Sequence, residues 1–285
     1  MPGTLYIVST PIGNLGDVTL RALEILRSVD VVLAEDTRHA RKLLDRYEVT
    51  TATTAYHEHN EARAVPQVLG RLERGERVAL ISDAGTPLLS DPGQRLVDAV
   101  AAAGVPVVPI PGASALLAAL VASGIDAARF TYLGFLARKG ADRAAELALV
   151  VASPVTVVVY ESPNRIATTL RDLVRLGAGT RTAAVARELT KMHEDVRRGT
   201  LEELAAYYEE TPARGEIVLV VAGRPPEAAP DGATLQAEAS RMRADGATVR
   251  DVVETLMTRY GAPRNLAYRL AQEAAGAPEP DPADV

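Results

Sequence analysis

The sequence predicts an α/β protein made of two α/β domains, with a small helical module after them. Three observations lead to this fold class. Short apolar, β-branched runs alternate with amphipathic helical patterns, the connections between them are a few residues long, and the alternation starts again near residue 130. The 285 residues are enough for two domains that each have a core.

The first half of the chain supplies five strands and five helices. Leu20, Leu23 and Leu26 illustrate the helical pattern, because they recur at intervals that place them on one helix face. Pro66 is the weak point of the third helix, since proline removes a backbone donor. We expect strands at 5–9, 30–35, 53–56, 77–82 and 105–110. We expect helices at 19–29, 38–47, 60–75, 93–104 and 114–123.

The second half repeats the alternation of strand and helix. The run "VTVVVYE" is strongly β-branched, as buried strands are, and Thr200 with Glu203 forms a capping box that begins a helix. We expect strands at 130–135, 155–161, 181–188 and 215–223. We expect helices at 141–152, 164–177 and 200–210.

Composition changes after the last of these strands. A Pro-, Gly- and Ala-rich stretch has the character of a linker, and three short helical patterns follow it with spacing that suits a helix-turn-helix-like bundle. We therefore expect a first α/β domain at 1–118, a second at 119–224, a linker at 225–233, a helical module at 234–276 and a flexible tail at 277–285.

The composition also excludes several classes of protein. The net charge of −6 argues against broad non-specific nucleic-acid binding, which depends on neutralising phosphates, although a local basic groove remains compatible with it. Because cysteine is absent, a disulfide framework and thiolate metal sites are excluded. No run of about 18 apolar residues occurs and the start lacks a signal-peptide layout, so we expect no membrane span and a cytoplasmic protein.

Polar, turn-rich loops follow five of the predicted strands. They read "STPIGNL" (9–15), "AEDTRH" (34–39), "SDAGTP" (82–87), "PGAS" (111–114) and "YESPNR" (160–165). Ligands of parallel sheets bind at the edge where the strands end, so these loops are expected to line one crevice. No lysine lies near 81–93 and the first strand lacks a G-x-G-x-x-G turn, so neither loop is a standard phosphate cradle.

The set of motifs resembles the tetrapyrrole methylase family of S-adenosylmethionine-dependent enzymes. More narrowly, it is similar to the branch that methylates the ribose 2′-hydroxyl of a cytidine in 16S ribosomal RNA. The motifs are "YIVSTPIGNLGD", "AEDTRH", "HEHNE", "ISDAGTPLLSDPG", "YESPNR" and "ARELTK", in this order between Leu5 and about Gly223. Departures are mild: family members often have proline where Ala113 and Ala137 stand, which affects loop shape and removes no reactive group.

This resemblance implies a cofactor cleft between two α/β domains, a homodimer, S-adenosylmethionine as methyl donor without a metal, and 16S rRNA of the small ribosomal subunit as partner. The glycine and alanine of "AGT" would let backbone approach the cofactor closely. Carried over by position, the cofactor-binding residues would be Pro11, Ala84, Gly85, Thr86, Leu89, Ser114, Ala115, Glu161 and Leu189.

Methyl transfer to a ribose hydroxyl needs alignment and a group that takes the proton or stabilises the alkoxide. The candidates are Glu35, Asp36, Asp83, Glu161, Glu188 and Lys191. Asp36, Glu161 and Lys191 stand out by position, with Arg38 beside the first. Each has an ordinary alternative: a helix N-cap for Asp36, an ion pair with Arg165 for Glu161, and an exposed loop charge for Lys191. The sequence does not choose among them.

Other functions also remain compatible with the sequence. Methylation of a porphyrin precursor is the alternative enzyme, but such enzymes usually carry a G-x-G-x-G-D first loop that this chain lacks. A helix-turn-helix regulator is the non-enzymatic rival, and the charge-balanced helical module argues against it. His57 and His59 alternate in "YHEHNE", but with no cysteine and few histidines we expect substrate-side polar contacts or a solvated loop there rather than a metal site.

Overall fold

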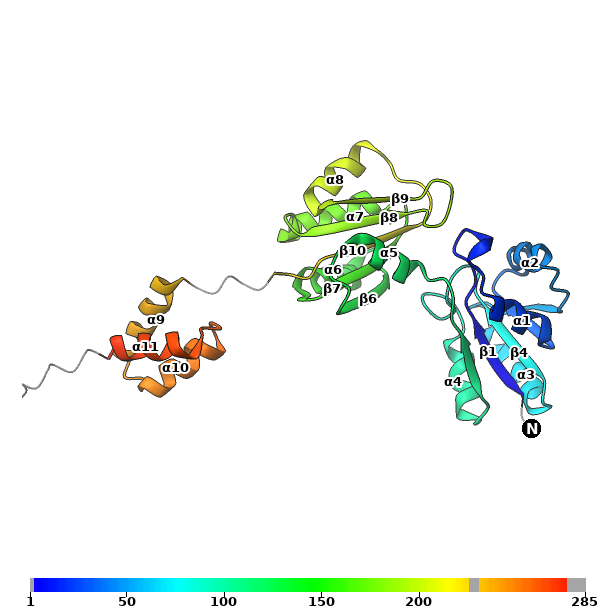
Figure 1. Cartoon of the computed structure of the whole chain (residues 1–285), viewed down its shortest axis with the longest axis horizontal. Helices are drawn as coiled ribbons and strands as arrows, with labels where there is room; N and C mark the ends of the chain where they lie inside the picture. The colour runs from blue at the N-terminus through cyan, green and yellow to red at the C-terminus, as the bar shows by residue number, and fades with distance from the viewer. Residues whose placement is uncertain (1–2, 226–230, 276–285) are drawn as a thin grey trace, which may run out of the picture. The chain divides into compact units, whose positions relative to one another are not determined.

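The computed structural model describes residues 3–225 and 231–275. The chain divides into two compact units, Met1–Arg224 and Pro225–Val285, of which the first contains two β-sheets and the second three helices (Figure 1). The expected linker includes the undescribed residues 226–230, and the expected tail at 277–285 lies outside the described residues.

The first sheet has five parallel strands in the order β3-β2-β4-β1-β5. Its strands are β1 (Thr4–Val8), β2 (Val31–Ala34), β3 (Thr53–Ala55), β4 (Arg77–Ile81) and β5 (Val107–Ile110). The connecting helices are α1 (Leu20–Ser28), α2 (Thr37–Arg46), α3 (Glu61–Glu73) and α4 (Gln94–Ala102). Because the strands are parallel, their carboxyl ends share one edge, and the loops at that edge position the site described below.

Alternation along the strands builds a three-layer structure from the first sheet. In β2, Val31 and Leu33 pack with residues of α3 and α4, whereas Val32 and Ala34 pack with residues of α1 and α2. Both faces of β2 are therefore buried, which explains why its sequence is an uninterrupted apolar run.

The second sheet is mixed, with strand order β6-β7-β10-β8-β9, and only the β6–β7 pair is parallel. Its strands are β6 (Phe130–Phe135), β7 (Thr156–Glu161), β8 (Thr182–Arg187), β9 (Asp195–Thr200) and β10 (Ile217–Val221). The helices α6 (Gly140–Ala152), α7 (Ile166–Leu173) and α8 (Leu201–Glu210) follow the sequence expectation, and α7 continues into the π-helical turn η2 (Val174–Ala178). The expectation that strand ends share one edge therefore holds for the first sheet only.

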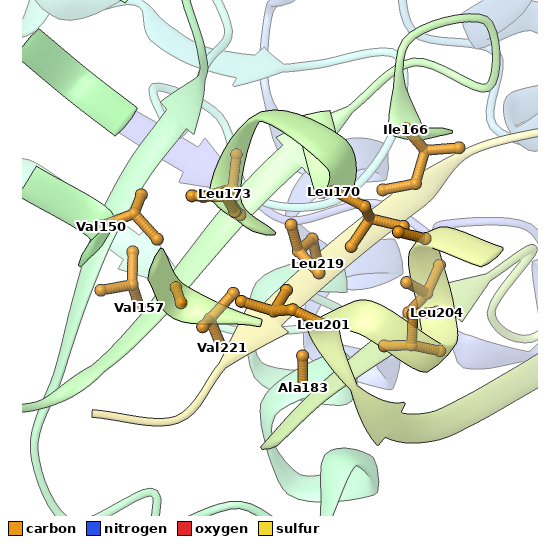
Figure 2. Close-up of a cluster of buried hydrophobic side chains, with 14 of the residues drawn as sticks. Val150, Val157, Ile166, Leu170, Leu173, Ala183, Leu201, Leu204, Leu219 and Val221 are labelled. Atoms are coloured by element: carbon orange, nitrogen blue, oxygen red, sulfur yellow. The ribbon is translucent and has the colours of Figure 1, made fainter. Parts of the chain in front are cut away.

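Two cores cover the two faces of the second sheet. Side chains of α6, α7 and α8 pack with β7, β8 and β10 on one face, where Leu170, Leu201 and Leu219 converge (Figure 2). Helix α5 (Ala115–Ser123), which follows β5 of the first sheet in the chain, packs on the other face through Leu116 and Leu120. The expected domain boundary after residue 118 thus falls inside a helix that packs on the second sheet.

The second unit consists of three helices, α9 (Gly232–Ala244), α10 (Val249–Thr258) and α11 (Arg264–Glu273). Leu235, Val252, Leu256 and Leu270 form its buried core, and Thr248 begins α10 with a capping box. Within the described residues, the range 234–276 contains these three helices and the turns between them. Within the described residues, none of the helices has the length and apolarity needed to cross a bilayer.

Candidate active site

Hydrogen bonds tie three loops together at the carboxyl edge of the first sheet. Thr10 and Gly85 exchange two backbone hydrogen bonds, of 2.8 and 3.0 Å, and form an isolated antiparallel bridge. The Ser9 and Thr86 hydroxyls lie 3.0 Å apart, and the Thr86 hydroxyl donates to the Ala113 carbonyl at 3.2 Å. Three of the loops that were expected at this edge are therefore joined into one preorganised wall.

The loop after β4 contains left-handed backbone at residues that disfavour it. Leu88 has φ of 74° and Ser90 has φ of 69°, in addition to Gly85 at 78° and Gly93 at 135°. A non-glycine residue in this region costs about 1–2 kcal/mol, and such strain concentrates at ligand sites. The stretch "ISDAGTPLLSDPG" is thus held in a shape that its sequence alone would not favour.

A cavity of about 380 Å³ lies against this loop, and we call it the cleft cavity. Its walls come from loops of both sheets, including Asp83 and Asp91 after β4, Tyr160 and Glu161 at the end of β7, and Ile217 of β10. Its volume falls in the range of small-molecule sites, roughly 300–1,000 Å³.

Most residues expected to bind the cofactor line the cleft cavity. These are Ala84, Gly85, Thr86, Leu89, Ser114, Ala115, Glu161 and Leu189. Pro11 instead lines an adjoining hollow of about 330 Å³, which we call the side hollow. The two spaces share the wall residues Ile12, Asp83, Ala84 and Glu216.

Two features of the cleft cavity fit an organic ligand. The Ser114 hydroxyl oxygen is buried and has no hydrogen-bond partner among the described residues, although it stands at the N-cap position of α5. A buried polar atom of this kind is normally satisfied by a ligand or water. At Gly85 a Cβ atom would lie 3.2 Å from the Ile12 Cγ2 atom, so any other residue at this position would crowd the cavity wall.

Glu161 is a fixed, buried carboxylate at the edge of the cleft cavity. Its oxygens accept hydrogen bonds from the Ser162 backbone at 2.8 Å and the Thr169 hydroxyl at 2.6 Å, and Arg165 pairs with it at 3.3 Å. Arg165 also donates to the Leu136 carbonyl at 2.7 Å, so it links the end of β7 to the segment that follows β6. The ion pair that the sequence offered as the alternative role for Glu161 is therefore present.

Asp36 and Arg38 form a local pair outside the cleft cavity. The Asp36 side chain caps α2 by accepting from the Arg38 backbone at 2.8 Å, and its other oxygen lies 3.0 Å from the Arg38 guanidinium. These hydrogen bonds lower the pKa of Asp36 to about 2, which makes it a weak base. The Arg38 side chain is 90% exposed.

Lys191 lies in the side hollow between two carboxylates. Its Nζ atom is 2.8 Å from Glu188 Oε1 and 3.2 Å from Glu216 Oε2. Burial by itself would lower the pKa of Lys191, but the hydrogen bond to Glu188 and the attraction of Glu216 outweigh it and raise the pKa. The same hydrogen bond lowers the pKa of Glu188. Lys191 is thus a cation in this arrangement, and Glu188 is its partner.

The structure adds a carboxylate that was not among the candidates from the sequence. Asp91 lines the cleft cavity, and burial followed by the nearby charges of Glu35 and Asp83 raises its pKa to about 6, even though a hydrogen bond from Ser82 opposes the shift. Burial and Asp83 raise the pKa of Glu35 as well. Asp91 is therefore the cavity carboxylate whose proton affinity best suits a base at neutral pH.

We expect Asp91 to make the fold less stable as pH rises. Its pKa is raised in the folded state from 3.8 to about 6, so the folded protein keeps a proton that the unfolded chain has lost, and the free energy of unfolding decreases across this window. Allowing for partial exposure, the decrease is about 1 kcal/mol. Urea unfolding gives the free energy of unfolding of wild type and of Asp91→Asn at about pH 4.5 and about pH 8. The value for the variant minus the value for wild type should be larger at the higher pH by this amount. If the difference in free energy of unfolding between the two proteins is the same at both pH values, this expectation is contradicted.

Aromatic side chains form the wall of the cleft cavity that the second sheet supplies. Tyr160 packs edge-on against Tyr132 and Phe135, with ring centroids 5.1 and 5.5 Å apart, and its hydroxyl accepts from the Leu116 backbone at 3.2 Å. Phe135 lines the cavity and is 55% exposed, so its ring offers a stacking surface. The sequence signal for Phe135 was only an apolar residue at a strand end.

No group of three or more metal-ligating side chains occurs in the described part of the chain. The His57 and His59 rings lie edge-on with centroids 6.0 Å apart. The His57 backbone amide donates to Asn60 at 3.0 Å, which holds the start of α3.

Comparison with known proteins identifies relatives over nearly the whole chain. A Synechocystis protein named ribosomal RNA small subunit methyltransferase I is 44% identical over 273 residues, which cover 95% of this chain and 98% of that protein. A Micromonospora olivasterospora protein of the same name is 47% identical over 279 residues, which cover 96% and 89%.

Solved structures share the fold of the first unit. The native uroporphyrin III C-methyl transferase from Thermus thermophilus aligns with a TM-score of 0.56 at 22% identity and covers 77% of this chain and 97% of that one. A cobalt precorrin-4 methyltransferase aligns at 0.58 and 19%, covering 77% and 94%. The family model described as tetrapyrrole (corrin/porphyrin) methylases matches residues 4–205. The chain therefore belongs to the tetrapyrrole methylase family.

Proposed function

We propose that this protein transfers a methyl group from S-adenosylmethionine to the ribose 2′-oxygen of a cytidine in 16S ribosomal RNA, with the small ribosomal subunit as its partner. The observation that carries this proposal is the near full-length similarity, at 44% identity, to a ribosomal RNA small subunit methyltransferase I. The cleft cavity gives it a physical site, since the strand-end loops and both sheets converge there. We accordingly propose that it acts in the cytoplasm.

The cleft cavity is the proposed cofactor site, and the cofactor supplies an electrophilic methyl group there. The bridged loops around Thr10 and Gly85 supply a rigid, close-packed wall, and the unpaired Ser114 hydroxyl supplies a hydrogen bond. Glu161, held by three donors, keeps the opposite wall in place. Holding the reacting groups in fixed alignment contributes several kcal/mol to the rate, and this is the main task of these residues.

We propose Asp91 as the group that takes the proton from the 2′-hydroxyl. Its carboxylate lines the cleft cavity, and with a pKa of about 6 it is unprotonated at neutral pH while remaining a stronger base than an ordinary aspartate. Lys191 is protonated and paired, so its proposed role is electrostatic: it holds Glu188 and Glu216 beside the shared wall. Asp36 orients Arg38, whose exposed guanidinium is a phosphate ligand in this scheme.

The alternative enzyme on this fold methylates a porphyrin precursor on carbon, and one assay separates the two activities. Purified protein is incubated with labelled S-adenosylmethionine and either small ribosomal subunits or uroporphyrinogen. We expect label in the RNA and none in the tetrapyrrole. Label in the tetrapyrrole alone would overturn the RNA proposal.

We also propose that the protein is a homodimer that buries the outer side of α5. Leu117 and Val121 lie one turn apart on this helix and are 51% and 74% exposed, while Leu116 and Leu120 pack on the sheet. An apolar helix side of this kind is typical of a subunit interface. We expect Val121→Glu to sediment as a monomer and wild type as a dimer. A wild-type monomer in analytical ultracentrifugation at micromolar concentration would contradict this.

A further inference from the structure

The side hollow adjoins the cleft cavity and has the lining of a nucleotide site. Its floor is apolar, with Leu15, Leu43 and Ile81, and polar groups surround that floor. Asp83 belongs to the wall that the two spaces share. A pocket with an apolar floor and a few convergent polar groups suits an aromatic base attached to a polar sugar.

Two hydrogen bonds fix the segments that border the side hollow. The Tyr47 hydroxyl, just beyond α2, donates to the Leu15 carbonyl at 2.8 Å and fixes one side of the hollow to the end of the helix. The Asn14 backbone amide donates to the Thr190 hydroxyl at 3.1 Å, which ties the loop after β1 to the loop that carries Lys191. The hollow is therefore bounded by the loop after β1, by α2 and by the loop that carries Lys191.

Helix α2 carries a concentration of positive charge that is unusual for this acidic chain. Between Thr37 and Arg46 it contains four basic side chains and one acidic side chain, whereas the whole chain has a net charge of −6. The basic side chains are all exposed: Arg38, Arg41, Lys42 and Arg46. Buried Ala40 and Leu44 hold the other side of the helix against the sheet.

Of the four arginine and lysine side chains of α2, Lys42 lines the side hollow, where His39 of the same helix also lies. Arg38 is paired with Asp36, and Arg41 lies 3.9 Å from Asp45. Lys42 has no ion pair among the residues that the structure describes. An unpaired ammonium at the rim of an apolar pocket is a ready ligand for a phosphate.

From these observations, and resting on the proposed function, we infer that the side hollow binds the target nucleotide of the RNA. Its base lies on the apolar floor, its ribose faces the wall shared with the cleft cavity, and its phosphate contacts Lys42. The flanking RNA backbone follows the exposed basic side of α2. This arrangement brings the 2′-hydroxyl to the wall shared with the cleft cavity, whose lining includes the proposed base Asp91.

The test compares Lys42→Ala with Lys42→Arg, and uses Lys139→Ala as a matched control. Lys139 is one of the other two lysines, is exposed at the start of α6, and lines neither the cleft cavity nor the side hollow. Methyl transfer to small ribosomal subunits gives KM and kcat, calorimetry gives the affinity for S-adenosylmethionine, and filter binding at several salt concentrations gives the salt dependence of RNA affinity.

We expect Lys42→Ala to raise KM for the subunit by roughly tenfold, with little change in kcat or cofactor affinity. The slope of log affinity against log salt concentration should fall by about one, because one phosphate contact is lost. Lys42→Arg should restore both values, and Lys139→Ala should match wild type. If wild type methylates the subunit and Lys42→Ala has the same KM and salt slope, the nucleotide site is overturned while the proposed function stands. If wild type transfers no label to the subunit, the proposed function fails and this site fails with it.

Discussion

Gly85→Val is expected to weaken S-adenosylmethionine binding by at least about 100-fold, or roughly 3 kcal/mol. Gly85 lines the cleft cavity with φ of 78°, and a Cβ atom there would already lie 3.2 Å from the Ile12 side chain. The two further methyl groups of valine would therefore project into the space proposed for the cofactor. Calorimetric titration of the purified variant with S-adenosylmethionine measures the loss.

Gly104→Val separates this steric effect from backbone strain. Gly104 has φ of 68°, similar to Gly85, but a Cβ atom there meets nothing within 4 Å. The two variants should therefore lose similar stability through strain, on the order of 1–2 kcal/mol. Only Gly85→Val should lose the cofactor. Equal affinities in both variants and wild type would show that the cofactor binds elsewhere.

The second large effect is expected at Asp91. Asp91→Asn keeps the size and polarity of the side chain but removes its basicity, so we expect kcat to fall by about 100-fold or more. In wild type, kcat/KM should rise as pH increases through about 6, the pKa of Asp91, because the base must be unprotonated. The variant should lack this rise and should bind S-adenosylmethionine as wild type does.

Lys191→Arg serves as the comparison for the identity of the base. Lys191 is held as a cation by Glu188 and Glu216, and arginine preserves that charge. We therefore expect turnover within about threefold of wild type. A collapse of turnover in Lys191→Arg, together with a wild-type rate and pH profile in Asp91→Asn, would transfer the role of base from Asp91 to Lys191.

Most of the fold could be predicted from local sequence patterns. The parallel first sheet was predictable because strands such as β2 are buried on both faces and leave uninterrupted apolar runs. The confirmed fold class follows from the alternation of such runs with amphipathic helices. Pro66 does not interrupt α3, because buried Val65 and Val68 pack on either side of it and hold the helix in place.

Features set by distant packing were not predictable in the same way. Strand β9 was missed because it lies at the sheet edge, and its sequence "DVRRGT" is charged and lacks the apolar alternation typical of a half-buried strand. Helix α5 is apolar throughout, so its sequence does not say which sheet it covers. Its packing on β8 and β10 became visible only in three dimensions.

The candidate site could likewise be predicted from the sequence only in part. Five loops that follow strands were predicted to converge, and four of them contribute residues to the lining of the cleft cavity, whereas the loop at 34–39 does not. Asp91 was not singled out, because its raised pKa depends on burial and on Glu35 and Asp83, which belong to other parts of the chain. Its sequence context, between Ser90 and Pro92, resembles an ordinary helix start.

The central claim is that the methyl group arrives on a ribose oxygen of ribosomal RNA. Small ribosomal subunits treated with the enzyme and S-adenosylmethionine can be digested to nucleosides and analysed by mass spectrometry. We predict that 2′-O-methylcytidine appears in proportion to enzyme turnover and is absent when Gly85→Val replaces wild type. Methyl groups found only on bases, or no new methylated nucleoside from active, cofactor-binding enzyme, would contradict the account.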